Sequence, residues 1–180
     1  MLNATDQVVH CAEIQVSSQQ KFYVSFVYGV NSIAGRIPLW QNFTDMAQSL
    51  YDPWCVVRDF NSVFNSGERM GGDEIQLAEI TDFTQCLRDC DLHEINTTGV
   101  FFTWTNKTIW SKIDRVLVNS ILHQGLGYTH VQSLTEGLPN HVPLKINFPS
   151  CQKRRQIFRL CEMWTFDPLF KNLVTQHWAK

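Results

Sequence analysis

Hydrophobic and polar residues alternate along the first part of the chain in the period-two pattern that is typical of β-strands. The alternation is loose over residues 8–16 and is followed by a polar stretch; apolar side chains then occupy every second position over residues 22–28. Because a strand directs successive side chains to opposite faces, this spacing predicts a hairpin with one apolar face.

Apolar residues recur at helical spacing in three later stretches. Residues 36–50 carry one apolar face, with Pro38 in the first turn, where proline is tolerated, and residues 76–89 carry a second. A third amphipathic helix is predicted over residues 167–178, which begin with an Asp-Pro pair. Further strands are predicted over residues 92–96, 100–105, 110–118, 128–133 and 142–148. Many strands with two helices between them predict a sheet-rich α+β fold or a two-sheet α/β layered fold.

One short apolar run stands out, the segment that begins at Pro53 and ends in a glycine-containing loop at Gly72. Its β-branched residues and the proline before it predict a buried central strand. The strand ends on Asp59 and Asn61, two positions apart, so both side chains are expected on the same side. Such a carboxylate and amide are typical of a catalytic edge, where the acid handles a proton and the amide binds an anion. Ordinary turn formation by Asp and Asn explains the same pair.

Composition excludes several classes of protein. Hydrophobic residues make up 44% of the 180 positions and charged residues 18%, which is enough for a core and excludes a disordered chain. The length predicts one domain or slightly more. The formal net charge is -2, so binding of a polyanion has to be local. Without a membrane-length apolar stretch or a signal peptide, we expect an intracellular protein that does not contact a membrane.

The cysteines are spread along the chain without a Cys-x-x-Cys pair. In a chain without a secretory signal this distribution favours reduced core residues over a disulfide framework. Cys86 and Cys90, four residues apart on a predicted helix, could place two thiolates on one metal. No second pair completes such a site, so packing in the core is the preferred interpretation. The six residues are Cys11, Cys55, Cys86, Cys90, Cys151 and Cys161.

Five short motifs, taken together and in order, connect the chain to a known family. They are Tyr-Gly-Val-Asn (28–31), Arg-Asp-Phe-Asn (58–61), Phe-Thr-Trp-Thr-Asn (102–106), Lys-Ile-Asp-Arg-Val-Leu-Val-Asn (112–119) and Pro-Asn-His-Val-Pro (139–143). Their order resembles that of the endonuclease/exonuclease/phosphatase superfamily, which includes deoxyribonuclease I and the apurinic endonucleases. Within it, the chain from about Val8 onward is most similar to the endonuclease region of plant non-LTR (LINE-type) retrotransposon polyproteins.

The resemblance implies a DNase I-like four-layered α/β sandwich, in which two packed, mainly antiparallel sheets are flanked by helices. It implies metal-dependent phosphodiester hydrolysis that nicks DNA, with Mg²⁺ or Mn²⁺ as cofactor, and a nuclear location. Residues 1–149 would form the endonuclease-like domain. Residues 150–180 would form the linker and helix that lead to reverse transcriptase in such polyproteins. The family's first strands, which carry an Asn and a metal-binding Glu, would precede residue 8, so we expect an N-terminally truncated domain.

The resemblance assigns roles to four residues around the scissile phosphate. Asp59 would position or deprotonate the attacking water, and Asn61 would hydrogen-bond the phosphate. Tyr28 and Asn31 would contact that phosphate or order the groups around it. Phosphodiester cleavage uses such groups together with a hard cation that offsets the charge of the transition state.

Further residues complete the site that the resemblance implies. Asp114 would pair with His141, fixing the tautomer of the imidazole and supporting its charge beside the phosphate. Arg36 and Trp104 are assigned to substrate binding; Trp104 would stack on a base or, alternatively, pack in the core. Asn140 stands where the family has a metal-binding aspartate.

Two differences from the family pattern concern charge. Asn140 replaces a carboxylate, and together with the missing glutamate this should remove most of the affinity for the metal. Arg58 replaces a glycine before Asp59. Strand alternation would turn Arg58 to the face opposite Asp59, as a buried charge, unless its side chain reaches solvent.

Three functions remain open at this point. The preferred hypothesis is a fragment of a retrotransposon endonuclease that keeps the fold in part and is catalytically impaired. The second is an active Mg²⁺-dependent DNA-nicking endonuclease. The third is a phosphoesterase of the same superfamily that acts on a small molecule, against which the retrotransposon-like C-terminal segment argues.

Overall fold

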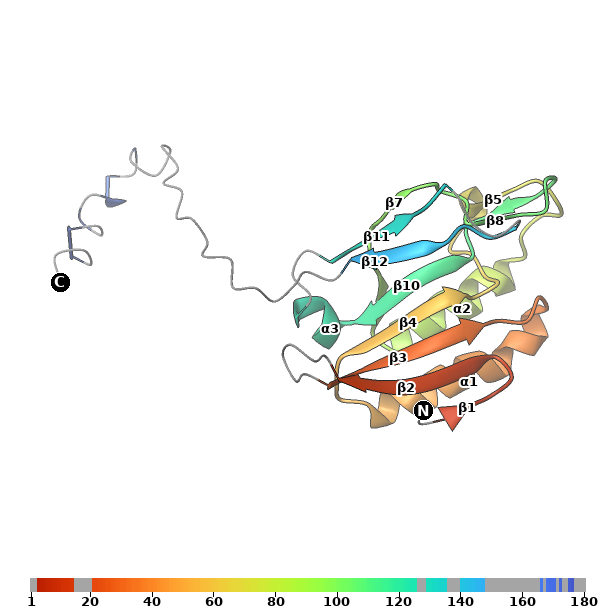
Figure 1. The fold of residues 1–180 in the computed structure, drawn as a ribbon, viewed down its shortest axis with the longest axis horizontal. Helices are drawn as coiled ribbons and strands as arrows, with labels where there is room; N and C mark the ends of the chain where they lie inside the picture. Colours follow the sequence, from red (N-terminus) through yellow and green to blue (C-terminus); the bar gives the residue numbers. More distant parts are fainter. Residues whose placement is uncertain are drawn as a thin grey trace. The chain divides into compact units, whose positions relative to one another are not determined.

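The fold is built on one six-stranded sheet. The computed structural model describes residues 3–14, 21–125, 129–135, 140–147, 166, 168–170, 172, 175 and 176. In spatial order the strands of this main sheet are β1 (Asn3–Ala4), β2 (Val8–Ile14), β3 (Lys21–Tyr28), β4 (Trp54–Asp59), β10 (Asp114–Asn119) and β6 (Leu92–Glu94). Strands β3 and β4 are parallel, and the other neighbouring pairs are antiparallel. Strands β4 and β10 occupy the buried centre (Figure 1).

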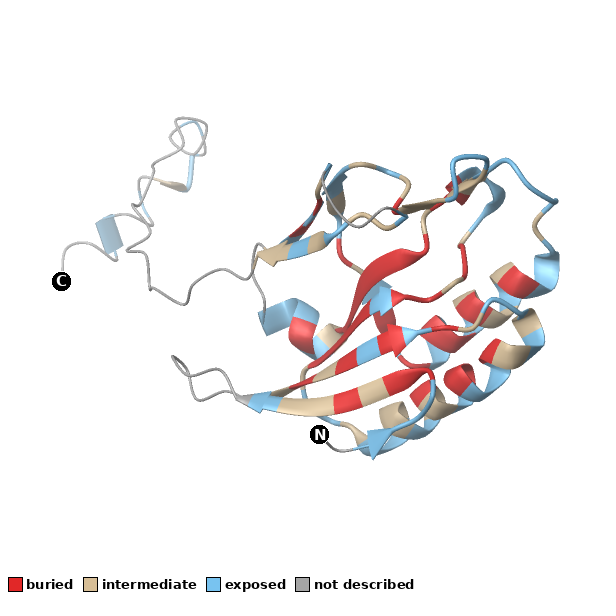
Figure 2. Cartoon of the chain, turned by 45° about the vertical axis from the view of Figure 1, so that its right-hand side comes forward, coloured by how far each residue is buried: buried red, intermediate tan, exposed pale blue. Residues whose placement is uncertain are grey.

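Helices α1 (Ile33–Ser49) and α2 (Leu77–Asp89) cover one face of the main sheet. Their inner sides and the strands that face them form the larger of two apolar clusters among the described residues. Figure 2 shows buried positions along both helices and the central strands. Phe43 is completely buried there, and its ring lies between 6.0 and 6.3 Å from the rings of Trp40, Trp54 and Phe60. Because each buried aromatic ring removes roughly 150–250 Å² from water, this cluster is the main source of stability.

Two small sheets complete the first part of the chain. One has the order β12 (Leu144–Asn147), β11 (His130–Ser133) and β7 (Thr97–Gly99), and the other β5 (Arg69–Met70), β9 (Trp110–Ser111) and β8 (Trp104–Thr105). A 3-10 turn, η1 (Ser66–Glu68), and helix α3 (Ser120–Gly125) are the remaining elements. The smaller apolar cluster joins β4 and β10 to β11 and β12. The prediction of an α+β fold with packed sheets and flanking helices is confirmed.

Three local predictions need correction. Helix α1 begins at residue 33, not 36, because the Ser32 side chain caps it by accepting a hydrogen bond from the N–H of Gly35. Pro38 is therefore in the second turn, where its missing N–H removes one helical hydrogen bond. The segment Thr97–Gly99, expected to be a turn, is a strand that pairs with β11 in parallel. Residues 110–118, expected to be one strand, are divided between β9 and β10.

The chain divides into two compact units, Met1–Ser150 and Cys151–Lys180. Half of the residues of the helix predicted over 167–178 lie outside the described residues. The four described cysteines are free, and all but Cys11 are buried, while Cys151 and Cys161 lie outside the described residues. Among the described helices, none is long and apolar enough to cross a membrane.

Arg58 interrupts the alternation of β4. Its φ angle is +97°, and its side chain is exposed and lines a groove together with Val57 and Val116 of the smaller apolar cluster. Regular alternation would place it on the helix-covered face beside its register partner Arg115, which is fully buried. The expected buried charge at residue 58 is therefore wrong, and the alternative, a solvent-exposed side chain, holds. A positive φ costs a side-chain-bearing residue about 1–3 kcal/mol, whereas glycine adopts it freely.

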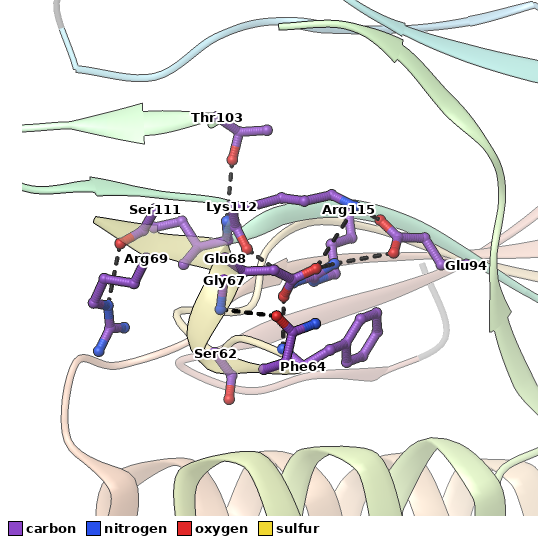
Figure 3. A network of polar contacts seen from close by, with 12 residues as sticks. Ser62, Phe64, Gly67, Glu68, Arg69, Glu94, Thr103, Ser111, Lys112 and Arg115 are labelled. Carbon is purple, nitrogen blue, oxygen red and sulfur yellow. Dashed lines mark hydrogen bonds and ion pairs between the residues drawn. The ribbon is translucent and has the colours of Figure 1, made fainter. Parts of the chain in front are cut away.

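A buried ion-pair network fixes the loop that follows β4 (Figure 3). The Arg115 guanidinium donates from both terminal nitrogens to the Glu68 carboxylate and from one of them to Glu94 at 3.0 Å. Glu68 also accepts a hydrogen bond from the N–H of Phe64 at 2.6 Å. Because a buried charge requires partners, this network holds the loop against the main sheet.

Candidate active site

Polar residues lie abreast at the ends of three neighbouring strands. In the register of β3 and β4, Tyr28 is opposite Asp59, and in the register of β4 and β10, Asp59 is opposite Asp114. The three residues therefore lie side by side at the same end of neighbouring strands in the main sheet. A pocket of about 650 Å³ opens at this end. The candidate site residues that line this pocket are Tyr28, Asn31, Asp59, Asn61, Trp104 and His141.

Asp59 is the buried carboxylate of this pocket, with 4% of its surface exposed. Burial raises its pKa to about 6. The neighbouring Asp114 charge acts in the same direction, while a hydrogen bond from the N–H of Asn61 to Asp59 Oδ1, 2.8 Å long, opposes the rise. A carboxyl group with such a pKa is largely ionised at neutral pH and can accept a proton from water.

Asn61 lies just beyond the end of β4 and has a φ angle of +49°. Its amide nitrogen donates to the carbonyl of Gly29 at 2.7 Å, which ties the ends of β3 and β4 together. A side chain at residue 29 would collide with the chain, because a Cβ atom there would lie 2.7 Å from the Phe60 carbonyl oxygen. The expectation that Asp59 and Asn61 face the same side agrees with their shared pocket, although Asn61 reaches it from a turn.

Asp114 and His141 form a hydrogen-bonded pair beside Asp59. His141 Nδ1 lies 3.0 Å and 3.3 Å from the two carboxylate oxygens of Asp114. The backbone N–H of Asp114 donates to the Thr103 hydroxyl at 2.9 Å, which fixes the start of β10. Since a carboxylate accepts from Nδ1–H, the other imidazole nitrogen is left for a substrate. The pairing inferred from the motifs is present; its catalytic role stays a prediction.

Tyr28 and Asn31 line the pocket with exposed side chains. Arg36, which was expected to bind substrate, does not line it. Its guanidinium is buried, donates to the carbonyls of Val30 and Asn31 at 3.0 and 2.9 Å, and lies 3.8 Å from Glu79. Arg36 thus orders the Asn31 turn and offers no exposed surface to a substrate, a position that follows from its place on the inner side of α1.

Trp104 lines the pocket from β8 and is half-buried; its contact with a substrate stays a prediction. Asn140 is exposed, and its carbonyl accepts a hydrogen bond from the N–H of Thr105 at 2.9 Å. Trp104 pairs with His141 in an isolated antiparallel bridge, whereas Asn140, beside His141 in the chain, does not line the pocket.

Four charged residues that line the pocket were missed by sequence reasoning; they are Arg69, Asp73, Glu74 and Glu79. Arg69 of β5 and Glu79 of α2 both line it and form an ion pair of 3.1 Å. None of the four belongs to one of the five motifs. The one local signal was the glycine-containing loop after β4, because Arg69 immediately precedes Met70 and Gly71.

The arrangement of sheets and helices is that of a DNase I-like fold. Comparison with family models finds no match, and neither does comparison with curated proteins. Among solved structures, the chain is similar to the endonuclease domain of TRAS1, a telomere-specific non-LTR retrotransposon (TM-score 0.59, 11% identity, 81% of this chain and 64% of that one). It is also similar to beta toxin from Staphylococcus aureus (TM-score 0.54, 11% identity, 79% and 57%). The chain spans less than two thirds of either protein.

Proteins of this fold are generally metal-dependent, so we asked whether the residues present fit a divalent cation. Among the described residues, no three His, Cys, Asp or Glu side chains are grouped closely enough to hold a metal. The pocket is lined by the carboxylates of Asp59, Asp73, Glu74 and Glu79, which do not form such a group; Glu79 is paired with Arg69, and Asp114 is occupied by His141. A hard cation prefers several oxygen ligands, so this donor set does not fit a metal site.

Proposed function

We propose that the chain is an endonuclease-type domain of retrotransposon origin that is catalytically impaired. The observation that carries the proposal is the contrast between a formed set of phosphate-handling groups, Asp59, Asn61 and the Asp114–His141 pair, and a donor set that does not fit a metal. The similarity to the TRAS1 endonuclease fold supports a nuclease ancestry. The finer assignment to LINE-type elements of plants depends on the motif resemblance.

The residues present can bind and orient a phosphodiester. His141, held by Asp114 through Nδ1, can donate a hydrogen bond to a phosphate oxygen from its other nitrogen when the imidazole is protonated at both nitrogens. Asp59, with its raised pKa, can accept a proton from a water molecule in the pocket. These groups position the reactants, but the charge that develops on the phosphate in the transition state lacks a strong counter-charge, so we expect slow or absent cleavage. DNA is the proposed partner.

An active endonuclease is the second candidate, and one observation favours it. Asp59 and the His141–Asp114 pair lie together at one end of β4 and β10. Cleavage of a phosphodiester needs a proton acceptor and a phosphate-binding group at such a short separation. Magnesium or manganese would then be the cofactor, supplying charge to the phosphate.

A nicking assay on supercoiled plasmid, with Mg²⁺ or Mn²⁺, separates the two candidates. The wild type is compared with Asp59→Ala and with Asp45→Ala, which removes an exposed carboxylate of α1 outside the pocket. We expect the wild type to nick no faster than Asp59→Ala. Metal-dependent nicking that is kept in Asp45→Ala and lost in Asp59→Ala would overturn the impairment.

The retrotransposon origin has its own test in the genome. A reverse transcriptase encoded in frame downstream of residue 180 is the expected finding. A different kind of domain encoded there would contradict the origin without bearing on the chemistry of the pocket.

A further inference from the structure

Arg69 is the one Lys or Arg side chain among the described residues that line the pocket. Its side chain keeps 23% of its surface exposed. The carboxylates that share the lining repel an anion; they are Asp59, Asp73, Glu74 and Glu79. Because the net charge of the chain is -2, attraction of a phosphate to this pocket has to come from a local cation.

The guanidinium groups of three other nearby arginines do not line this pocket. Arg36 is buried against two backbone carbonyls, and Arg115 is buried in the network with Glu68. Arg58 is exposed but lines the neighbouring groove and not this pocket. Arg69 is therefore the arginine that a ligand in the pocket can reach.

Two contacts hold the Arg69 guanidinium in place. Its Nε donates to the Ser111 hydroxyl at 3.2 Å, and Nη2 donates to Glu79 at 3.1 Å. In the contacts among described residues, Nη1 has no partner. Figure 3 shows the side chain extending to the side away from Arg115. Because β5 is paired with β9, with Arg69 opposite Ser111, the backbone that carries the guanidinium is fixed as well.

We propose that Arg69 binds the phosphate group of a phosphodiester in this pocket, an inference that rests on the proposed function. A planar guanidinium matches two phosphate oxygens, and Nη1 with Nη2 can provide the two donors. Glu79 holds the guanidinium in position when no ligand is bound. The same carboxylate competes with the phosphate for Nη2, so it sets the affinity.

Binding of labelled duplex DNA, measured by fluorescence anisotropy over a series of salt concentrations, tests the proposal. Arg69→Gln is expected to weaken binding on the order of tenfold and to lower the salt slope by about one. Arg88→Gln is the matched control, because it removes the same charge from an exposed position of α2 that lines neither the pocket nor the neighbouring groove. It is expected to keep nearly wild-type affinity and slope. Unchanged binding by Arg69→Gln would overturn the proposal.

A merely structural role for Arg69 makes a different prediction. If Arg69 binds phosphate, Glu79→Gln frees the guanidinium and strengthens DNA binding, and most of this gain disappears in the Arg69→Gln background. If the pair only holds α2 to β5, Glu79→Gln weakens binding or leaves it unchanged, and the gain is absent. Thermal unfolding of each variant checks that it is folded.

Titration with diethyl phosphate, followed by NMR of the arginine Nε–H groups, separates this inference from the proposed function. A shift of the Arg69 signal in the wild type supports the phosphate site even if the protein binds no DNA, an outcome that would count against the nuclease ancestry. Absence of binding to both diethyl phosphate and DNA by the wild type would refute the Arg69 site itself.

Discussion

Replacing Asp59 by Asn should stabilise the fold at neutral pH. Burial raises the pKa of Asp59 from 3.8 to about 6. The folded state therefore holds this proton more tightly than the unfolded state, and the stability it contributes is lost as the pH rises from about 4 to 6. At 1.4 kcal/mol per pKa unit, the ionised carboxylate costs about 3 kcal/mol above pH 6.

Asparagine is neutral at every pH and keeps an oxygen that can accept the hydrogen bond from the N–H of Asn61. The free energy of unfolding of Asp59→Asn should exceed that of the wild type by about 3 kcal/mol at pH 7.5. The difference should shrink through the pH 6 to 4 window and vanish below it. Urea unfolding at pH 4, 5 and 7.5 measures this difference directly.

Asp45→Asn provides the control, because it neutralises an exposed carboxylate of α1. Its effect on stability should be small and should not grow between pH 4 and 7.5. A gain for Asp59→Asn that is equal at all three pH values would refute the reasoning, since it would show that desolvation of the charged form is not the cause. Destabilisation at pH 7.5 would refute it as well.

Three further changes test the packing that supports the site. Arg58→Gly should raise the free energy of unfolding by about 1 kcal/mol, because glycine adopts the φ angle of +97° without strain; Arg58→Ala, which keeps the strain, should give no such gain in the same urea titration. Glu68→Gln should destabilise by about 3 kcal/mol, since Arg115 is then left buried with incomplete compensation; a loss below about 1 kcal/mol would show that water reaches the pair. Phe43→Ala should cost about 3–5 kcal/mol in thermal unfolding, and a smaller loss would mean that the aromatic cluster collapses around the cavity.

Periodicity in the sequence was enough to predict the elements that bury one continuous face. The central strand, the hairpin before it and the helix that became α2 were all within a few residues of their observed bounds. The start of α1 was missed because it depends on one side-chain cap at Ser32. Strand β7 was missed because its pairing partner, β11, is more than thirty residues away, and its own Thr-Thr-Gly sequence has turn character.

The residues of the candidate site also differ in how far the sequence predicts them. Asp59 and Asn61 could be selected from their place at a strand end, whereas Tyr28, Asp114 and His141 became candidates through the order of motifs. The prediction that Arg36 binds substrate failed for a physical reason: neither helical spacing nor a motif shows whether an arginine near the start of a helix turns toward the pocket or into the core. Arg69 could not be selected at all, because its place in the pocket follows from the pairing of β5 with β9.

The Glu68–Arg115 network has a consequence for motion. The segment from Phe64 to Arg69 ends in the arginine that lines the pocket. It is held to the main sheet by charges that cannot be exposed one at a time without a large penalty. Its amide protons should therefore exchange with solvent only when the sheet itself opens, and not through local fluctuations. The backbone that carries Arg69 is therefore already rigid before an anion binds, so that little conformational entropy is lost on binding.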